Sequence, residues 1–127
     1  MVANSLVAVD VHNHYLTSDG YIVIVYPTDS EIQRDIEEIT KKVILRNGNE
    51  LGRISSYMYD KRGEGVYTSK SKTMTLTHFA GKLGIANIGL EVPSFTRDKG
   101  GYLVQVDQAR IMDTNVEMFS RIAEYVN

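Results

Sequence analysis

The sequence contains no cysteine among its 127 residues, which excludes disulfides and thiolate metal sites. A metal site would therefore have to use histidine, aspartate, glutamate or water. No run of about eighteen apolar residues occurs, so we expect no membrane span. The first five residues lack the charged and apolar regions of a signal peptide, and together with the absent cysteine this favours a cytoplasmic protein.

The charge balance also lacks an excess of one sign. The chain has 14 basic and 16 acidic residues and a net charge of −2, so it does not resemble the basic footprint of a nucleic-acid binder. Its 127 residues, 43% of them hydrophobic, are enough for one core. Because we find no repeat, linker or low-complexity segment, we predict a single domain over residues 1–127.

The hydrophobic pattern predicts strands and helices in mixed order. Ser30 and Gln33 form a capping box, which predicts a helix that runs to about Arg46 and ends at Asn47-Gly48. The predicted strands lie at residues 6–11, 21–26 and 85–92, with a short extended segment at 102–106 and a further candidate at 53–59. The fold class is therefore α/β, with a mixed sheet and flanking helices.

Two further helices and one loop complete the prediction. A second helix is expected over 73–83 and ends at Gly84. Thr114 with Glu117 predicts the start of the last helix. Residues 60–65 look like a mobile loop. The apolar stripe of the last helix comprises Val116, Phe119, Ile122, Ala123 and Val126.

A cluster of polar residues lies at the end of the first predicted strand. Asp10, His12 and His14 alternate along it, and on an extended chain residues two apart share a face. Neutral imidazole is a common metal ligand, and a neighbouring carboxylate fixes its tautomer. The alternatives are histidines that only hydrogen-bond at a strand end or lie on the surface. The third histidine, His78, is expected to be a partly buried helix residue.

Glu91 is the second candidate, because it stands alone in an otherwise apolar strand. A buried unpaired charge is costly, so such a carboxylate usually has a partner or a function. Desolvation would raise its pKa toward that of a general base. If the strand end is exposed, Glu91 is instead an ordinary solvated residue.

Together, Asp10-Val11-His12-Asn13 and Leu90-Glu91-Val92 resemble two motifs of the zinc carboxypeptidase superfamily. The match is to its aspartoacylase and succinylglutamate desuccinylase branch, and to the C-terminal half of that fold. There, a strand ends in Asp-x-His-Asn, whose histidine binds zinc; a helix, a short turn and a strand with a general-base glutamate come later. The corresponding segments here are 75–83, 84–86 and 88–92.

The resemblance implies a zinc-dependent hydrolase-like domain that acts on an amide bond. It assigns His12 to the metal and Glu91 to catalysis, and His14 is our own hypothesis for a further ligand. The implied partner is a small-molecule or peptide carboxylate substrate, and a homo-oligomer is left open. The family's other zinc motif, His-x-x-Glu, does not occur in this chain.

Several interpretations therefore stay open. The chain is an inactive family member or a fragment of a larger hydrolase, a hydrolase that completes its site with His14 or a second chain, or a non-catalytic binding or structural domain. Asp-x-His-x-His also resembles the metal motif of amidohydrolase barrels. Those barrels need about 250 residues, more than this chain has.

Overall fold

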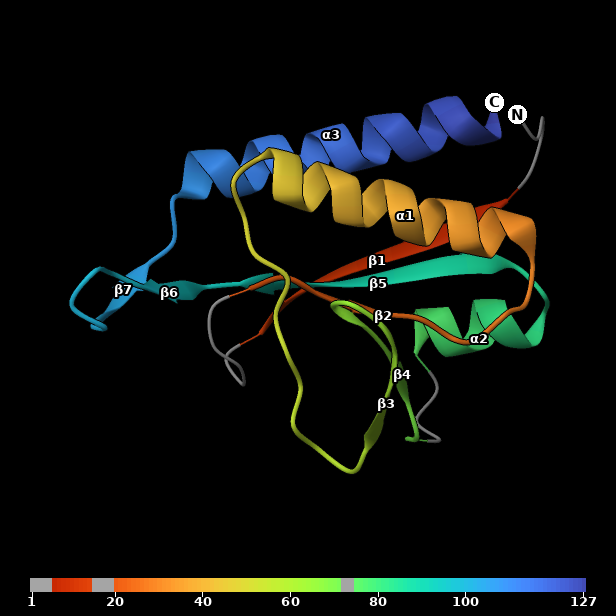
Figure 1. Ribbon diagram of the computed structural model, residues 1–127. Helices are drawn as coiled ribbons and strands as arrows, with labels where there is room; N and C mark the ends of the chain where they lie inside the picture. The colour runs from red at the N-terminus through yellow and green to blue at the C-terminus, as the bar shows by residue number, and fades with distance from the viewer. Residues whose placement is uncertain (1–5, 15–19, 72–74) are drawn as a thin grey trace.

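β1 and β5 form the long parallel pair of a five-stranded mixed sheet (Figure 1). The computed structural model describes residues 6–14, 20–71 and 75–127. The sheet has the order β1-β5-β2-β4-β3, in which β2 runs antiparallel to β5 and parallel to β4. The strands are β1 (Val7–His14), β2 (Ile22–Ile24), β3 (Tyr59–Gly63), β4 (Val66–Ser69) and β5 (Ala86–Pro93).

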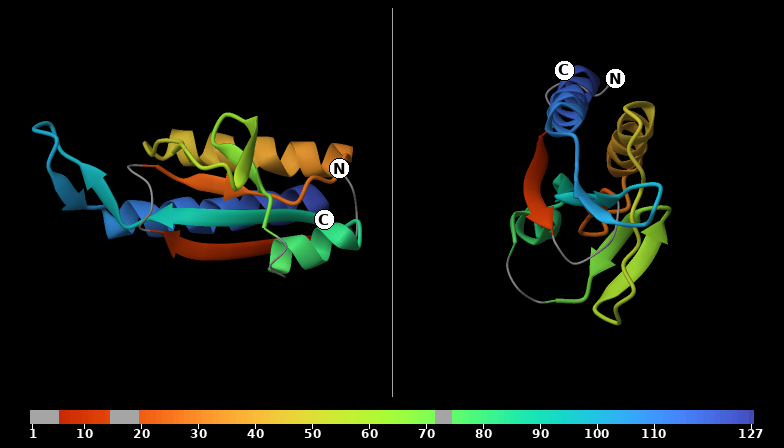
Figure 2. Two further views of the ribbon diagram at one scale, coloured as in Figure 1. Left: turned by 90° about the horizontal axis from the view of Figure 1, so that it is seen from below. Right: turned by 90° about the vertical axis from the view of Figure 1, so that its left-hand side faces the viewer.

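The described helices cover the two faces of this sheet unequally. α1 (Glu31–Arg46) and α3 (Gln108–Val126) lie side by side over one face, and α2 (Leu76–Lys82) lies against the other (Figures 1 and 2). β6 (Phe95–Arg97) and β7 (Leu103–Gln105) form a separate hairpin beyond the sheet. The predicted α/β fold, a mixed sheet with flanking helices, is therefore confirmed.

The core lies between the sheet and the α1–α3 layer. Ile88 and Leu90 of β5 are fully buried there, as are Ile36 of α1 and Met118 of α3. Along β5, Ile88 and Leu90 alternate with Gly89 and Glu91, which lie on the opposite face of the sheet. Because one face of β5 packs into the core, only the residues on its other face, among them Glu91, can contribute to a functional site.

A buried polar network joins α1 to β5. The Gln33 amide exchanges hydrogen bonds of 2.8 Å with both the N–H and the carbonyl oxygen of Asn87. Its nitrogen also donates to Glu37, whose other carboxylate oxygen accepts from Arg62 of β3. The Asn87 side-chain oxygen in turn accepts the backbone N–H of Tyr26 at 2.7 Å. Gln33 therefore serves the tertiary structure rather than closing the predicted capping box.

The first helix begins after its predicted N-cap residue and ends at its predicted stop, with the Ser30 half of the capping box formed. The Ser30 hydroxyl accepts a hydrogen bond from the N–H of Gln33, and the helix ends at Asn47 with Gly48 at a φ of 79°.

The start of the last helix was predicted wrongly. α3 begins after Asp107, whose carboxylate accepts from the N–H groups of Ala109 and Arg110. Thr114 is a buried interior residue, and its hydroxyl donates to the carbonyl of Arg110. The predicted stripe divides in the structure: Ile122 faces the core, whereas Val116 and Phe119 are exposed.

The predicted loop at 60–65 is mostly a hairpin. Asp60 and Lys61 pair with β4, and a bulge follows before the turn that contains Gly65. The strand predicted at 53–59 is absent except for Tyr59, the first residue of β3. Charged residues are common in exposed edge strands, which explains why this segment resembles a loop in the sequence.

Candidate functional site

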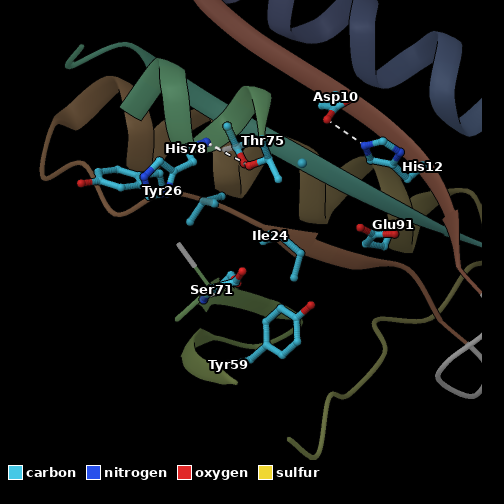
Figure 3. Close-up of a pocket in the computed structure, with 13 residues that line it drawn as sticks. Asp10, His12, Ile24, Tyr26, Tyr59, Ser71, Thr75, His78 and Glu91 are labelled. Carbon is cyan, nitrogen blue, oxygen red and sulfur yellow. Dashed lines mark hydrogen bonds and ion pairs between the residues drawn. The ribbon is translucent and has the colours of Figure 1, made fainter. Parts of the chain in front are cut away.

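The parallel register of β1 and β5 places His12 directly opposite Glu91. Both residues lie close to the carboxyl ends of their strands and line one pocket on the face away from α1 and α3 (Figure 3). The structure thus brings the two sequence-predicted residues together. Asp10 lines the same pocket, opposite Gly89 in the register.

Asp10 orients the imidazole of His12. The Nε2 atom of His12 lies 2.8 Å from a carboxylate oxygen of Asp10, with side-chain exposures of 59% and 26%. When Nε2–H donates this bond, Nδ1 keeps its lone pair and is free to accept a proton or bind a metal. Asp10 is therefore a partner of His12 rather than a parallel ligand beside it.

α2 forms the second wall of the pocket. Its N-cap residue Thr75 accepts from the N–H of His78, and both residues line the pocket with Thr77. The half-buried His78 ring packs edge-on against Tyr26, with ring centroids 5.1 Å apart. The partly buried helix position predicted for His78 is confirmed, but its place in the lining of the same pocket as His12 depends on tertiary packing that the sequence did not reveal.

Two glycines allow α2 to approach the sheet. A Cβ atom on Gly89 would lie 2.8 Å from the carbonyl oxygen of Ile24 and 3.2 Å from Thr77. A Cβ atom on Gly81 would lie 2.2 Å from the Tyr26 ring. All three distances are shorter than ordinary van der Waals contact, so the pocket wall depends on the absence of these side chains.

The β3–β4 hairpin supplies the third wall. Tyr59 and Ser71 point toward the pocket from this side (Figure 3). Two tyrosines near this hairpin in the sequence do not line the pocket: Tyr57 is 84% exposed and Tyr67 is buried. Tyr15 lies outside the described residues.

A catalytic zinc normally has three protein ligands and one open position. Among the described side chains, no group of three or more His, Asp or Glu residues is placed to hold a metal ion. His14 belongs to β1 by its backbone, but its side chain is outside the described part. The described side chains alone therefore do not fit a complete catalytic zinc site; they offer the His12 imidazole and nearby carboxylates.

Within the described chain, no helix combines the length and apolar character needed to cross a membrane. Comparison with models of protein families, with curated proteins and with solved structures finds no match to this chain. The function must therefore be argued from the residues and geometry of the site itself.

Proposed function

We propose that this chain is a hydrolase-like domain of the carboxypeptidase or deacylase type, with a metal site that its described side chains do not complete. The observation that carries the proposal is the register of β1 and β5, which sets His12 opposite Glu91 at one pocket. The motif resemblance suggests an amide substrate that carries a carboxylate. The proposed reaction is hydrolysis of the amide bond.

Glu91 is the proposed general base. Its side chain is half-buried at the pocket, between the His12 strand and the β2 strand. A carboxylate there can take a proton from water as the water oxygen attacks the amide carbon, and can then return the proton to the leaving nitrogen. One C–O bond forms, one C–N bond breaks, and the enzyme returns to its starting protonation state.

His12 is the proposed metal ligand of this chain. Its bond to Asp10 is the kind of outer contact that fixes the orientation of a metal-binding imidazole. Since the described residues give no group of three ligands, a complete zinc site would need side chains beyond them. His14 is the candidate nearest in sequence.

Zinc binding is tested with the purified chain by metal analysis and by thermal unfolding with and without added zinc. At a free zinc concentration one hundred times the dissociation constant, binding adds about 2.7 kcal/mol to the unfolding free energy. His12→Ala should abolish this gain, whereas His78→Ala, which removes the other described imidazole of the pocket, should retain it. A chain that contains no zinc and gains no stability from it would contradict the metal-dependent part of the proposal.

Catalysis is tested with Glu91→Gln. Amide hydrolysis should fall by about a hundredfold or more, because general-base catalysis contributes on this scale. Glu124→Gln, which changes an exposed glutamate of α3, is the matched control and should leave the rate unchanged. Equal rates in wild type and Glu91→Gln would remove Glu91 from the mechanism.

The second candidate is a non-catalytic binding or structural domain. The missing group of three ligands among the described side chains favours it. In that case Glu91→Gln would be tolerated, zinc would not bind tightly, and the pocket would still bind a small polar ligand. Metal content and hydrolysis together distinguish the two functions.

A further inference from the structure

β1 forms one border of the sheet, and its outer edge carries no strand in the described residues. Its only ladder is with β5. The strand is eight residues long and has the sequence VAVDVHNH, without proline or lysine. Natural proteins usually protect such long edges with charge, proline, bulges or a covering element. β1 is therefore suited to pair with a further strand.

α3 presents apolar side chains on the same side of the molecule. Its opposite flank is bound to α1: Glu117 forms an ion pair with Arg46, and the hydroxyl of Tyr125 donates to Asp35 at 2.5 Å. At 3.6 residues per turn, the exposed apolar residues lie on the far side of α3 from these contacts. Figure 2 shows α1 and β1 on opposite sides of α3. The α3 stripe consists of Met112, Val116 and Phe119, exposed by 64%, 56% and 44%.

α2 repeats this arrangement on the other face of the sheet. Its inner flank contacts Tyr26 through His78 and Gly81. Residues at the spacing i, i+3 and i+7 form a stripe that points away from Tyr26, and α2 packs against both β1 and β5. The α2 stripe consists of Leu76 and Phe79 of the helix and its C-cap residue Leu83, exposed by 47%, 54% and 62%.

All three layers of the fold thus end on one side in features that favour association. A helix lies on each face of the sheet beside β1, whose outer edge pairs with no strand of the described residues (Figure 2). Each of these helices carries an exposed apolar stripe. Contiguous exposed apolar surface on a soluble domain commonly marks an interaction site. We propose that this side binds a second copy of the same chain, by antiparallel pairing of the two β1 strands about a twofold axis.

The hydrogen-bonding side chains of β1 suit pairing with a second copy of the same strand. On the pocket face, Asp10 and His12 are neighbours two residues apart, so an antiparallel copy can set Asp10 of each chain opposite His12 of the other. Val11 then faces Val11 on the core face, where it is 38% exposed in the single chain. Sliding the copy by two residues to pair Asp10 with Asp10 would place like charges together, which is destabilising.

A twofold axis normal to the sheet keeps each helix layer on its own face. The α3 stripe then packs against the α3 stripe of the copy. α2 starts level with Asp10 and extends toward the first residues of β1, so its stripe flanks one end of the seam and the α2 stripe of the copy flanks the other end. Such an isologous interface uses one surface twice, which is the commonest form of homodimer. The paired strands make the two sheets continuous and satisfy the outer backbone groups of β1.

The dimer would also add side chains to the proposed metal site, an inference that rests on the proposed function. It brings His12 and Asp10 of the partner subunit to the pocket face beside the same residues of the first chain. Directly opposite side chains in an antiparallel pair have Cβ atoms about 4.5–5.5 Å apart, and diagonal ones remain within reach of an imidazole. Two imidazoles, each hydrogen-bonded to an Asp10 carboxylate in its own chain, thus lie at the seam, and His12 of the partner subunit is a second candidate ligand beyond the described residues of one chain.

Sedimentation of the whole chain tests whether the side formed by β1 and the α3 stripe binds a second copy. Wild type should sediment as a dimer of the 14.3 kDa chain. Val116→Lys and Phe119→Lys should each weaken the dimer by about tenfold or more, because each buries a charge at the interface. Leu45→Lys, at a 54% exposed position of α1, is the matched control and should remain dimeric. Circular dichroism verifies that all variants fold.

Cross-linking tests the register. The chain has no cysteine, so Val11→Cys introduces one thiol, which can only join two chains. It should oxidise readily to a disulfide-linked dimer, whereas Leu45→Cys should not. A wild-type chain that is monomeric at every concentration, or a dimer that both lysine substitutions leave unchanged, overturns the proposal.

Zinc measurements separate this proposal from the proposed function. A dimer that binds no zinc supports the surface and contradicts the metal site. A monomer that binds zinc tightly through His12 contradicts the surface and supports the metal site. Zinc binding that is lost when Phe119→Lys dissociates the dimer supports both.

Discussion

Replacing Gln33 by methionine tests the network that holds α1 to β5. The two side chains have similar volume, so the change removes hydrogen bonds while it leaves the packing nearly filled. Gln33 is fully buried and bonds both the N–H and the carbonyl of Asn87, which is also fully buried. After the substitution the N–H and the carbonyl of Asn87 have lost that partner at a position buried from bulk solvent.

The magnitude follows from these two groups. A buried polar group left unsatisfied costs about 1–3 kcal/mol, so two of them lower the free energy of unfolding by roughly 2–6 kcal/mol. The Asn87 side chain offers little relief, since its oxygen already accepts from Tyr26. Domains of this kind have total stabilities of about 5–15 kcal/mol, so the loss would be a large fraction.

Urea unfolding followed by far-ultraviolet circular dichroism measures the effect, since the chain has no tryptophan for fluorescence. The midpoint should fall by roughly 1–3 M, with an unchanged slope. Gln105→Met, at an exposed position of β7, is the matched control and should change little. A loss below about 1 kcal/mol for Gln33→Met would refute the assigned role of the network.

Three further predictions concern stability. Gly81→Ala should destabilise the domain by about 1–3 kcal/mol in urea unfolding despite the better helix propensity of alanine, because the new Cβ would meet the Tyr26 ring, whereas Gly63→Ala has open space around it. Asp107→Ala should cost about 1 kcal/mol through the lost α3 cap, and Asp113→Ala, within the helix, should cost less; equal losses would contradict the observed start of α3. The hydrogen bond to Asp35, followed by desolvation, raises the pKa of Tyr125 from 10.0 to about 12. Folding therefore stabilises the neutral form of Tyr125. This contribution to the free energy of unfolding is complete below pH 10 and is lost as pH rises toward 12. The free energy of unfolding of Tyr125→Phe, measured at alkaline pH, should lack this loss between pH 10 and 12.

The sequence predicted the elements whose signals are local. The strand around Leu90 and the helix after Ser30 are examples, because apolar runs and caps act within a few residues. The start of α3 could not be decided locally, since Asp107 and Thr114 are both acceptable caps. Thr114 is buried and bonded to Asn49, a contact that depends on the assembled fold.

The candidate site was predictable only in part. His12 and Glu91 could be chosen from their motifs, and the register of β1 and β5 joins them. The position of His78 in the pocket lining depends on the packing of α2 against Tyr26, which no sequence pattern predicts. The predicted apolar stripe of the last helix combined core and surface residues: Ile122 is buried, whereas Phe119 is 44% exposed.

The position of β1 at the border of the sheet also sets how long the site stays assembled. In the single chain, His12 is held by a strand with one neighbour, whereas Glu91 belongs to a strand with neighbours on both sides. Border strands open by local fluctuation far more often than the centre of a sheet, so amide hydrogens of β1 should exchange before those of β5. Each such opening carries His12 away from Glu91 while the core around Leu90 stays folded. The time for which His12 and Glu91 stay together is thus set by how long β1 remains paired with β5.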